Sequence, residues 1–131
     1  MSSTVTKTAA AQVAEAKSHI ENLTPQSVAE ELAGGGALLV DLREPSERAE
    51  NGVIHSAVHA PRGMLEFYAD PTSPYHRAEF SPKRRIILQC ASGGRSALAV
   101  ETLMTLGYTD VAHLDGGFKA WKEQGLPVEQ A

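Results

Sequence analysis

Short apolar runs, separated by polar and glycine-rich segments, set the pattern of this chain. They predict strands over residues 37–42, 57–60, 86–89 and 111–114. The first run shows no alternation of polar and apolar positions, as expected for a parallel strand that is covered on both faces. The second run is stopped by Pro61.

Helical segments are expected between these strands. Thr24 and Pro25 suit an N-cap and a first helical position, and the glycines at 34–36 suit the end of that helix. Further helices or helical turns are predicted at 45–50, 64–68, 95–106 and 117–124, with an irregular loop at 70–82. Apolar side chains of the last two helices are assigned to the core: Leu103, Met104, Leu106, Phe118 and Trp121.

The first residues of the chain have a different character. They are rich in Ala, Ser and Thr, and apolar residues recur there at helical spacing: Val5, Ala9, Val13, Ala16 and Ile20. This stripe fits a docked amphipathic helix or a frayed extension. We therefore expect an N-terminal extension over residues 1–20 and a single domain over residues 21–131.

The alternation of strands and helices predicts an α/β domain, with a parallel or mostly parallel sheet and helices on both faces. In such sheets ligands bind beyond the carboxyl ends of the strands. Cys90 follows one strand, and Arg43, Glu44 and Arg62 follow others, so we expect all four at one edge. The basic residues 83–85 precede their strand and are expected at the opposite edge, as a solvated run.

The amino-acid composition limits the classes of function that this chain can have. The 131 residues are 42% hydrophobic, which suffices for one core, and the net charge of −4 disfavours a nucleic-acid partner. A single cysteine suits a reducing compartment. An apolar signal segment and a run of transmembrane length are both missing, so we expect a cytoplasmic protein without a membrane partner.

The cysteine itself is the main chemical signal. Cys90 ends the strand at 86–89, and Ala91, Ser92, Gly93 and Gly94 separate it from Arg95 at a helix start. Such a turn directs backbone N–H groups and the positive end of a helix dipole at one point. Both favour an anion, and both favour the reactive thiolate over the thiol. We interpret Cys90 as a nucleophile rather than a buried structural cysteine.

The motifs of this chain resemble the single-domain rhodanese (sulfurtransferase) family. The resemblance spans about residues 23–128 and rests on VDLREP (40–45), CASGGRS (90–96), LGY (106–108), LDGGFKAW (114–121) and GLPV (125–128). One segment departs from it: where the family usually reads Gly-His-Ile-Pro-Gly-Ala, residues 52–57 read Gly-Val-Ile-His-Ser-Ala. That change affects loop geometry and removes no catalytic group.

The resemblance implies a three-layer domain with a five-stranded, mostly parallel sheet, and a cysteine that carries sulfane sulfur. Cys90 would form the persulfide, and the N–H groups from Ala91 through Ser96 would hold the outer sulfur. Arg95 would steer an anionic donor such as thiosulfate, and Asp41 would be structural. Arg43 and Arg62, at the same edge, are further candidates for substrate binding. The partners would be a small-molecule sulfur donor and a thiol or cyanide acceptor, without a cofactor.

A Cys-dependent phosphatase or arsenate reductase on the same fold is the main alternative. Tyrosine phosphatases place five residues between cysteine and arginine, whereas four stand here, and Gln89 replaces the usual preceding histidine. A tetrahedral oxyanion needs a wider cradle than one sulfur atom, so the shorter loop favours sulfur. Residues near the loop in sequence include no Asp that could protonate a leaving group.

Two weaker interpretations remain. A rhodanese-like module that only binds a partner would typically lack the cysteine, which is present here.

His55 and His59 stand four apart, but on a strand that spacing is roughly 13 Å, so we expect no metal site. The sequence leaves the oligomeric state and the physiological donor and acceptor open.

Overall fold

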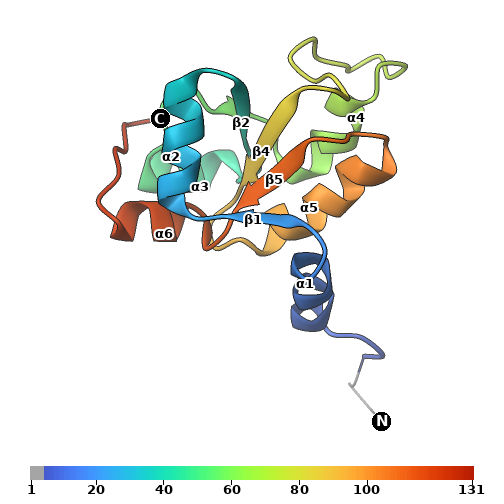
Figure 1. Cartoon of the computed structure of the whole chain (residues 1–131), viewed down its shortest axis with the longest axis horizontal. Helices are drawn as coiled ribbons and strands as arrows, with labels where there is room; N and C mark the ends of the chain where they lie inside the picture. Colours follow the sequence, from blue (N-terminus) through green and yellow to red (C-terminus); the bar gives the residue numbers. More distant parts are fainter. Residues whose placement is uncertain (1–4) are drawn as a thin grey trace.

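The computed structural model describes residues 5–131, so the first four residues of the expected N-terminal extension lie outside the described part. Within it, five strands form one sheet in the order β1-β5-β4-β2-β3, and every pairing is parallel (Figure 1). The strands are β1 (Glu21–Leu23), β2 (Ala37–Asp41), β3 (Val58–His59), β4 (Arg85–Gln89) and β5 (Val111–Leu114). The expected α/β fold with a parallel five-stranded sheet is confirmed.

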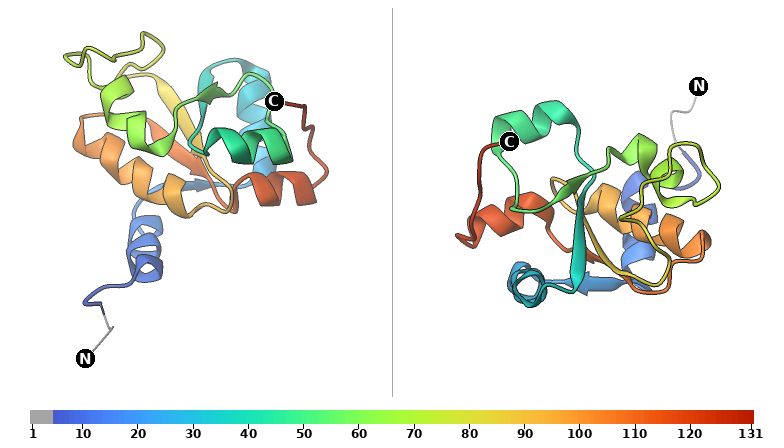
Figure 2. Two further views of the ribbon diagram at one scale, coloured as in Figure 1. Left: turned by 180° about the vertical axis from the view of Figure 1, so that it is seen from behind. Right: turned by 90° about the horizontal axis from the view of Figure 1, so that it is seen from above.

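Helices follow most strands and cover both faces of the sheet (Figure 2). They are α1 (Ala9–Lys17), α2 (Pro25–Gly34), α3 (Pro45–Asn51), α4 (Leu65–Ala69), α5 (Gly94–Thr105) and α6 (Gly117–Glu123), with a 3₁₀ turn η1 (Arg62–Met64) before α4. Thr24 caps α2 as its sequence predicts: its side chain accepts a hydrogen bond from the Ser27 N–H. None of the helices in residues 5–131 is long and apolar enough to cross a membrane.

The core has two parts because successive strand residues point to opposite faces. Leu88 and Cys90 belong to the part that α4 and α5 cover, together with Leu103 of α5. Ile87 belongs to the part on the other face, which includes residues of α2 and α6. Trp121 of α6 is buried there, and its indole N–H donates to the Pro127 carbonyl at 2.8 Å, as a core residue with one polar handle should.

The pairing register places the expected functional residues at one edge of the sheet. Asp41 pairs with Gln89, the residue before Cys90, and Leu88 pairs with His113. The carboxyl ends of β2, β4 and β5 therefore align. The loops that leave these three strands meet at the same edge.

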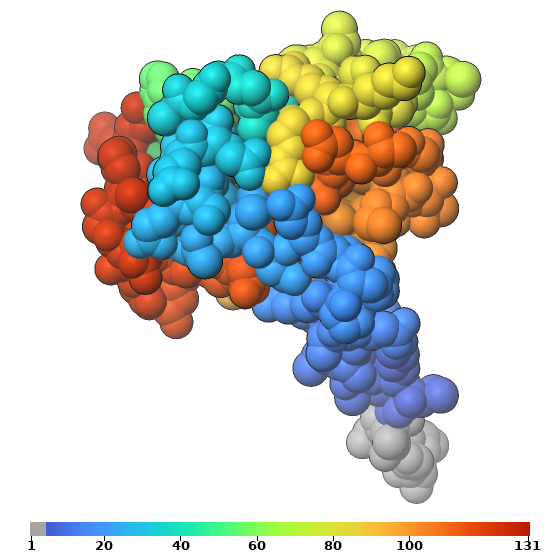
Figure 3. Space-filling view, in the orientation of Figure 1, coloured from blue at the N-terminus to red at the C-terminus, as the bar shows by residue number. Residues whose placement is uncertain are grey.

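The α1 helix docks on the domain rather than fraying. Ala16 is fully buried, Lys17 forms an ion pair with Asp115 at 3.0 Å, and the helix lies against α5. Its N-terminal end projects from the body of the molecule (Figures 1 and 3). The sequence pattern does not predict β1, which connects α1 to the sheet and pairs with β5.

Two expectations about side chains are wrong. Met104 and Leu106 are 47% and 40% exposed instead of lying in the core. The buried stripe of α5 runs through Val100 and Leu103, so the next position falls outside it, and Leu106 lies at the end of the helix. In the basic run 83–85, Lys83 and Arg84 are exposed as expected, but the expectation fails at Arg85, which is partly buried and forms ion pairs with Glu21, Glu31 and Asp110.

Candidate active site

The loop after β4 surrounds the thiol of Cys90. Two backbone N–H groups donate to Cys90 Sγ, that of Gly93 at 3.2 Å and that of Ser96 at 3.4 Å. Gly93 has a φ of +100°, a conformation that glycine adopts readily, and α5 begins at the next residue. The sulfur thus lies at the N-terminus of a 12-residue helix, and Cys90 is only 1% exposed.

The start of α6 holds this loop in place through two backbone hydrogen bonds. The N–H of Phe118 donates to the Cys90 carbonyl at 2.8 Å, and the N–H of Lys119 donates to the Ala91 carbonyl at 3.0 Å. These two bonds tie the carbonyls of Cys90 and Ala91 to α6, while the N–H groups of Gly93 and Ser96 donate to the sulfur. The sequence LDGGFKAW supplies this support, whose role is not apparent from spacing alone.

Arg95 is held by a carboxylate from another helix. Its two terminal nitrogens each donate to a Glu47 oxygen of α3 at 2.8 Å. This paired geometry is the strong form of an Arg–carboxylate contact. Arg95 lowers the pKa of Glu47 to about 2, and Glu47 raises the pKa of Arg95 further above its usual range. Sequence reasoning missed Glu47, which stands 48 residues away from Arg95.

Ser96 connects the thiol to a buried histidine. Ser96 Oγ lies 3.6 Å from Cys90 Sγ and 2.8 Å from His113 Nδ1. His113 Nε2 lies 2.8 Å from Asn22 Oδ1. Burial lowers the pKa of His113 to about 4, so its ring is neutral at pH 7. The sequence signal that could have identified His113 is its position within an otherwise apolar strand.

The other two arginines expected to bind substrate have different partners. Arg43 is 1% exposed, forms a two-point ion pair with Asp41 and stacks 4.1 Å from the centre of the Phe118 ring. The Arg62 side chain donates to Glu66 and Thr102. The structure therefore brings Arg95 and Ser96 to Cys90, and it gives Arg43 and Arg62 hydrogen bonds outside the loop.

A cavity with two lysines in its lining adjoins the loop. It encloses about 440 Å³, and Ala91, Phe118, Lys119 and Lys122 contribute to its lining. The two lysines attract an anion, and Glu123, which also lines the cavity, offsets part of their charge. Arg43, whose buried guanidinium contacts the Phe118 ring, also borders the cavity.

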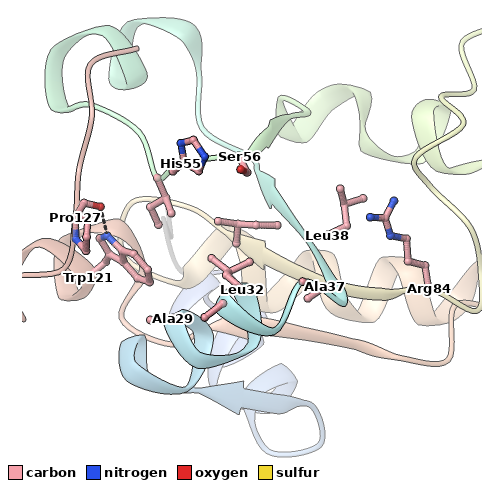
Figure 4. Close-up of a pocket in the computed structure, with 13 residues that line it drawn as sticks. Ala29, Leu32, Ala37, Leu38, His55, Ser56, Arg84, Trp121 and Pro127 are labelled. Carbon is pink, nitrogen blue, oxygen red and sulfur yellow. Dashed lines mark hydrogen bonds between the residues drawn. The ribbon is translucent and has the colours of Figure 1, made fainter.

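A second cavity, of about 510 Å³, is lined largely by aliphatic residues and has no residue of the Cys90 loop in its lining (Figure 4). Leu32 and Trp121 form part of its walls, with His55 at one end and Arg84 at the other.

The histidines considered for a metal have other contacts. His55 faces Glu129 at 3.2 Å, and His59 contacts the Arg43 carbonyl at 2.6 Å. Among residues 5–131, no cluster of three or more His, Cys, Asp or Glu side chains is arranged to hold a metal ion.

Comparison with known proteins identifies the family. The model of the rhodanese-like domain family matches residues 24–124, so the chain belongs to that family. A sulfurtransferase of Allochromatium vinosum is 34% identical over 83% of this chain and 94% of its own length. The chloroplastic thiosulfate sulfurtransferase 16 of Arabidopsis thaliana is 31% identical over 86% of this chain and 97% of its own.

A solved structure resembles almost the whole chain. It belongs to a Rhodopseudomonas palustris protein described as being of unknown function and a possible tyrosine phosphatase. The identity is 39% and the TM-score 0.91, over 98% of this chain and 99% of the other. The match therefore covers most of the N-terminal extension as well as the domain.

Proposed function

We propose that this protein is a sulfurtransferase that moves sulfane sulfur from a donor such as thiosulfate to a thiol or cyanide through a persulfide on Cys90. One observation carries the proposal: the N–H groups of Gly93 and Ser96 both donate to Cys90 Sγ at the start of α5. In a rhodanese-like chain, this is the arrangement that stabilises a thiolate and then a negatively charged persulfide.

The reaction has two displacements. The Cys90 thiolate attacks the outer sulfur of thiosulfate, an S–S bond forms, and the bond from that sulfur to the sulfonate breaks with release of sulfite. The acceptor thiolate or cyanide then attacks the outer sulfur, and Cys90 leaves as a thiolate. The loop N–H groups from Ala91 to Ser96 hold the charge on the outer sulfur in between.

Charge around the loop supports an anionic donor. Arg95 is 39% exposed, so its guanidinium remains accessible to solvent while Glu47 orients it. Lys119 and Lys122 line the adjoining cavity. Arg95 and these two lysines would draw thiosulfate toward Cys90.

A phosphatase or arsenate reductase is the second candidate, and the likeness to the Rhodopseudomonas palustris protein favours it. The loop argues against it, because four residues separate Cys90 from Arg95 and two of the loop N–H groups already converge on the single sulfur atom. A phosphoryl group presents three equatorial oxygens and needs a wider ring of donors.

Paired assays separate the candidates. We expect measurable sulfur transfer from thiosulfate to cyanide, background turnover of p-nitrophenyl phosphate, and loss of sulfur transfer in Cys90→Ser. Inserting one glycine between Gly93 and Gly94 should weaken sulfur transfer, since the N–H groups would no longer meet at one atom. Hydrolysis of the aryl phosphate through Cys90 without sulfur transfer would establish the second candidate. Inactivity in both assays would favour a partner-binding module.

We also propose that the protein works in the cytoplasm. The single cysteine must cycle between thiol and persulfide. A reducing compartment would keep its thiol reduced and would supply other thiols as acceptors. Fractionation of the source cells with an antibody to the protein tests this, and recovery in an oxidising compartment would contradict it.

A further inference from the structure

We propose that Ser96 and His113, oriented by Asn22, form a proton relay that removes the thiol proton of Cys90 and later returns it. The proposal rests on the sulfur transfer proposed above, because that reaction needs Cys90 as a thiolate. Ser96 touches the sulfur. His113 and Asn22 act through Ser96 and are positioning residues.

The direction of each hydrogen bond follows from Asn22 at β1. Both protons of its side-chain amide can be placed: Nδ2 donates to the carbonyls of Lys17 and Ile20, at 3.0 and 3.1 Å. Its oxygen therefore faces His113 Nε2 at 2.8 Å, and an oxygen there requires a proton on Nε2. A neutral imidazole protonated at Nε2 has a free lone pair on Nδ1.

That lone pair determines the orientation of the Ser96 hydroxyl. His113 Nδ1 lies 2.8 Å from Ser96 Oγ and accepts its proton, so the oxygen lone pairs of Ser96 are available to Cys90. The thiol then donates to Ser96 Oγ at 3.6 Å, a normal length for sulfur. The chain of donors runs in one direction, from Cys90 through Ser96 to His113.

Within residues 5–131, the relay supplies the hydrogen-bond acceptors through which a proton can leave the sulfur of Cys90. Cys90, Ser96 and His113 are 1%, 0% and 0% exposed, so bulk water does not contact them appreciably. The other polar groups at the sulfur are the N–H groups of Gly93 and Ser96 and the guanidinium of Arg95, which donate and cannot accept a proton. Ser96 Oγ is the acceptor that the thiol proton faces.

Proton transfer through this chain is balanced. The S–H bond of Cys90 breaks as its proton binds Ser96 Oγ, and the original Ser96 proton passes to His113 Nδ1. The products are a thiolate, an unchanged serine and an imidazolium. When the acceptor takes the outer sulfur and Cys90 leaves as a thiolate, the proton returns along the same path.

Charged groups surround both ends of the relay. At His113, Asp115 favours the imidazolium and Lys17 of α1 opposes it, while these two pair with each other at 3.0 Å. At Cys90, the nearby charged group is the guanidinium of Arg95, which Glu47 of α3 binds. Burial keeps His113 neutral at rest, so it holds the proton only while a negative charge on Cys90 faces it.

The relay also gives the N-terminal extension a role. Asn22 reaches back to the carbonyl of Lys17, the last residue of α1, and the Val13 side chain approaches the loop at Gly94. Docking of α1 on α5 thus orients the amide that determines the His113 tautomer. The part of the chain outside the expected domain is connected to the chemistry of Cys90.

The first test needs no substitution. In the ¹⁵N NMR spectrum of the wild-type protein at neutral pH, we expect His113 to be neutral, with the proton on Nε2 and none on Nδ1. A proton on Nδ1 would overturn the relay, because that nitrogen could not accept from Ser96.

The second test measures thiol ionisation in variants. Cys90 is the only cysteine, so alkylation rate and thiolate absorbance report on it alone. Asn in place of His113 keeps an oxygen near the Nδ1 position but cannot take a proton. We expect His113→Asn to slow alkylation at pH 7 about tenfold, and to lower kcat for thiosulfate with KM unchanged. His55→Asn, on an exposed histidine, is the control and should behave as wild type.

A third variant should have the opposite effect. Asn22→Asp keeps an oxygen on His113 Nε2 and adds a negative charge, which makes Nδ1 more basic, so alkylation at pH 7 should be faster than in wild type. Structural damage would expose the buried thiol and speed alkylation in both variants, so it cannot explain slower alkylation in His113→Asn; in Asn22→Asp, thiolate absorbance distinguishes greater ionisation from greater exposure. Equal rates in wild type, His113→Asn and Asn22→Asp would overturn the relay. Alkylation requires no sulfur donor, so these rates test the relay even if the protein transfers no sulfur.

Discussion

Gly117 and Cys90 approach so closely that a Cβ atom on Gly117 would lie 2.6 Å from the Cys90 carbonyl oxygen. The same atom would lie 2.7 Å from the carbonyl of Ala91, and Gly117 has a φ of +64°. Space and backbone conformation both require glycine at this position. The contact is part of the support that α6 gives to the loop.

Gly117→Ala should therefore damage both stability and the site. We expect a loss of about 2–4 kcal/mol in the free energy of unfolding, from backbone strain and a contact with atoms that cannot move freely. Sulfur transfer per folded molecule should fall as well, because the loop must shift. Chemical denaturation and the thiosulfate–cyanide assay measure the two effects.

Two other glycines serve as controls. At Gly107, φ is +102° and a Cβ would meet nothing within 4 Å, so Gly107→Ala isolates backbone strain. At Gly63 neither strain nor crowding applies, and Gly63→Ala should be nearly neutral. If Gly117→Ala were as active and stable as Gly63→Ala, the α6 contact would not position the loop.

Arg43 should contribute to stability rather than to donor binding. Arg43→Met leaves the buried Asp41 carboxylate with only Arg48 as an ionic partner, which should cost about 3–5 kcal/mol. In the folded fraction, the KM for thiosulfate should stay unchanged. Arg62→Met is the matched comparison: that arginine is 30% exposed and its pair with Glu66 is worth well under about 1 kcal/mol. A raised KM with unchanged stability in Arg43→Met would instead assign that residue to the donor site.

His113 should make stability sensitive to mild acid. Burial lowers its pKa from the ordinary 6.5 to about 4 in the folded protein, so the unfolded chain binds the proton first as pH falls. Stability should therefore decrease from pH 6.5 towards 4, by up to roughly 3 kcal/mol from this group. Urea unfolding at several pH values tests this. His113→Asn should flatten the slope in that window and His55→Asn should not, whereas an unchanged slope in His113→Asn would show that His113 is not the group responsible.

Glu47 should affect the stability of the protein at a lower pH than His113 does. Arg95 lowers its pKa from 4.5 to about 2, so the pair stabilises the folded state above pH 4.5 and loses this contribution as pH falls towards 2. Glu47→Gln should lower stability at neutral pH and reduce the acid dependence below pH 4.5. Glu50→Gln, on the exposed side of the same helix, provides the control. Parallel curves for wild type and Glu47→Gln would mean that the pair contributes little.

Local patterns are enough to predict most of the sheet and the position of the loop. The strand at 111–114 agrees residue by residue with β5, and the strands at 37–42 and 86–89 differ from β2 and β4 by one residue. Buried parallel strands leave a clear apolar signal, and Cys90 stands where one of them ends. The short edge strand β1 leaves no such signal, because its sequence, Glu-Asn-Leu, is largely polar and exposed.

Contacts between distant segments cannot be predicted in this way. Glu47 reaches Arg95 across 48 residues, and Asn22 reaches His113 across 91. Their proximity depends on the order of strands in the sheet, which brings β1 beside β5 and α3 beside the loop after β4. The motif at 114–121 contributes to the family resemblance, but only the structure shows that its second glycine fits against Cys90.

The most direct test of the sulfurtransferase proposal is the intact mass of the protein after incubation with thiosulfate. We expect a gain of one sulfur atom per chain, reversed by cyanide and absent in Cys90→Ser, because Cys90 is the only thiol. A wild-type mass that stays unchanged with thiosulfate and with other persulfide donors would contradict the proposal.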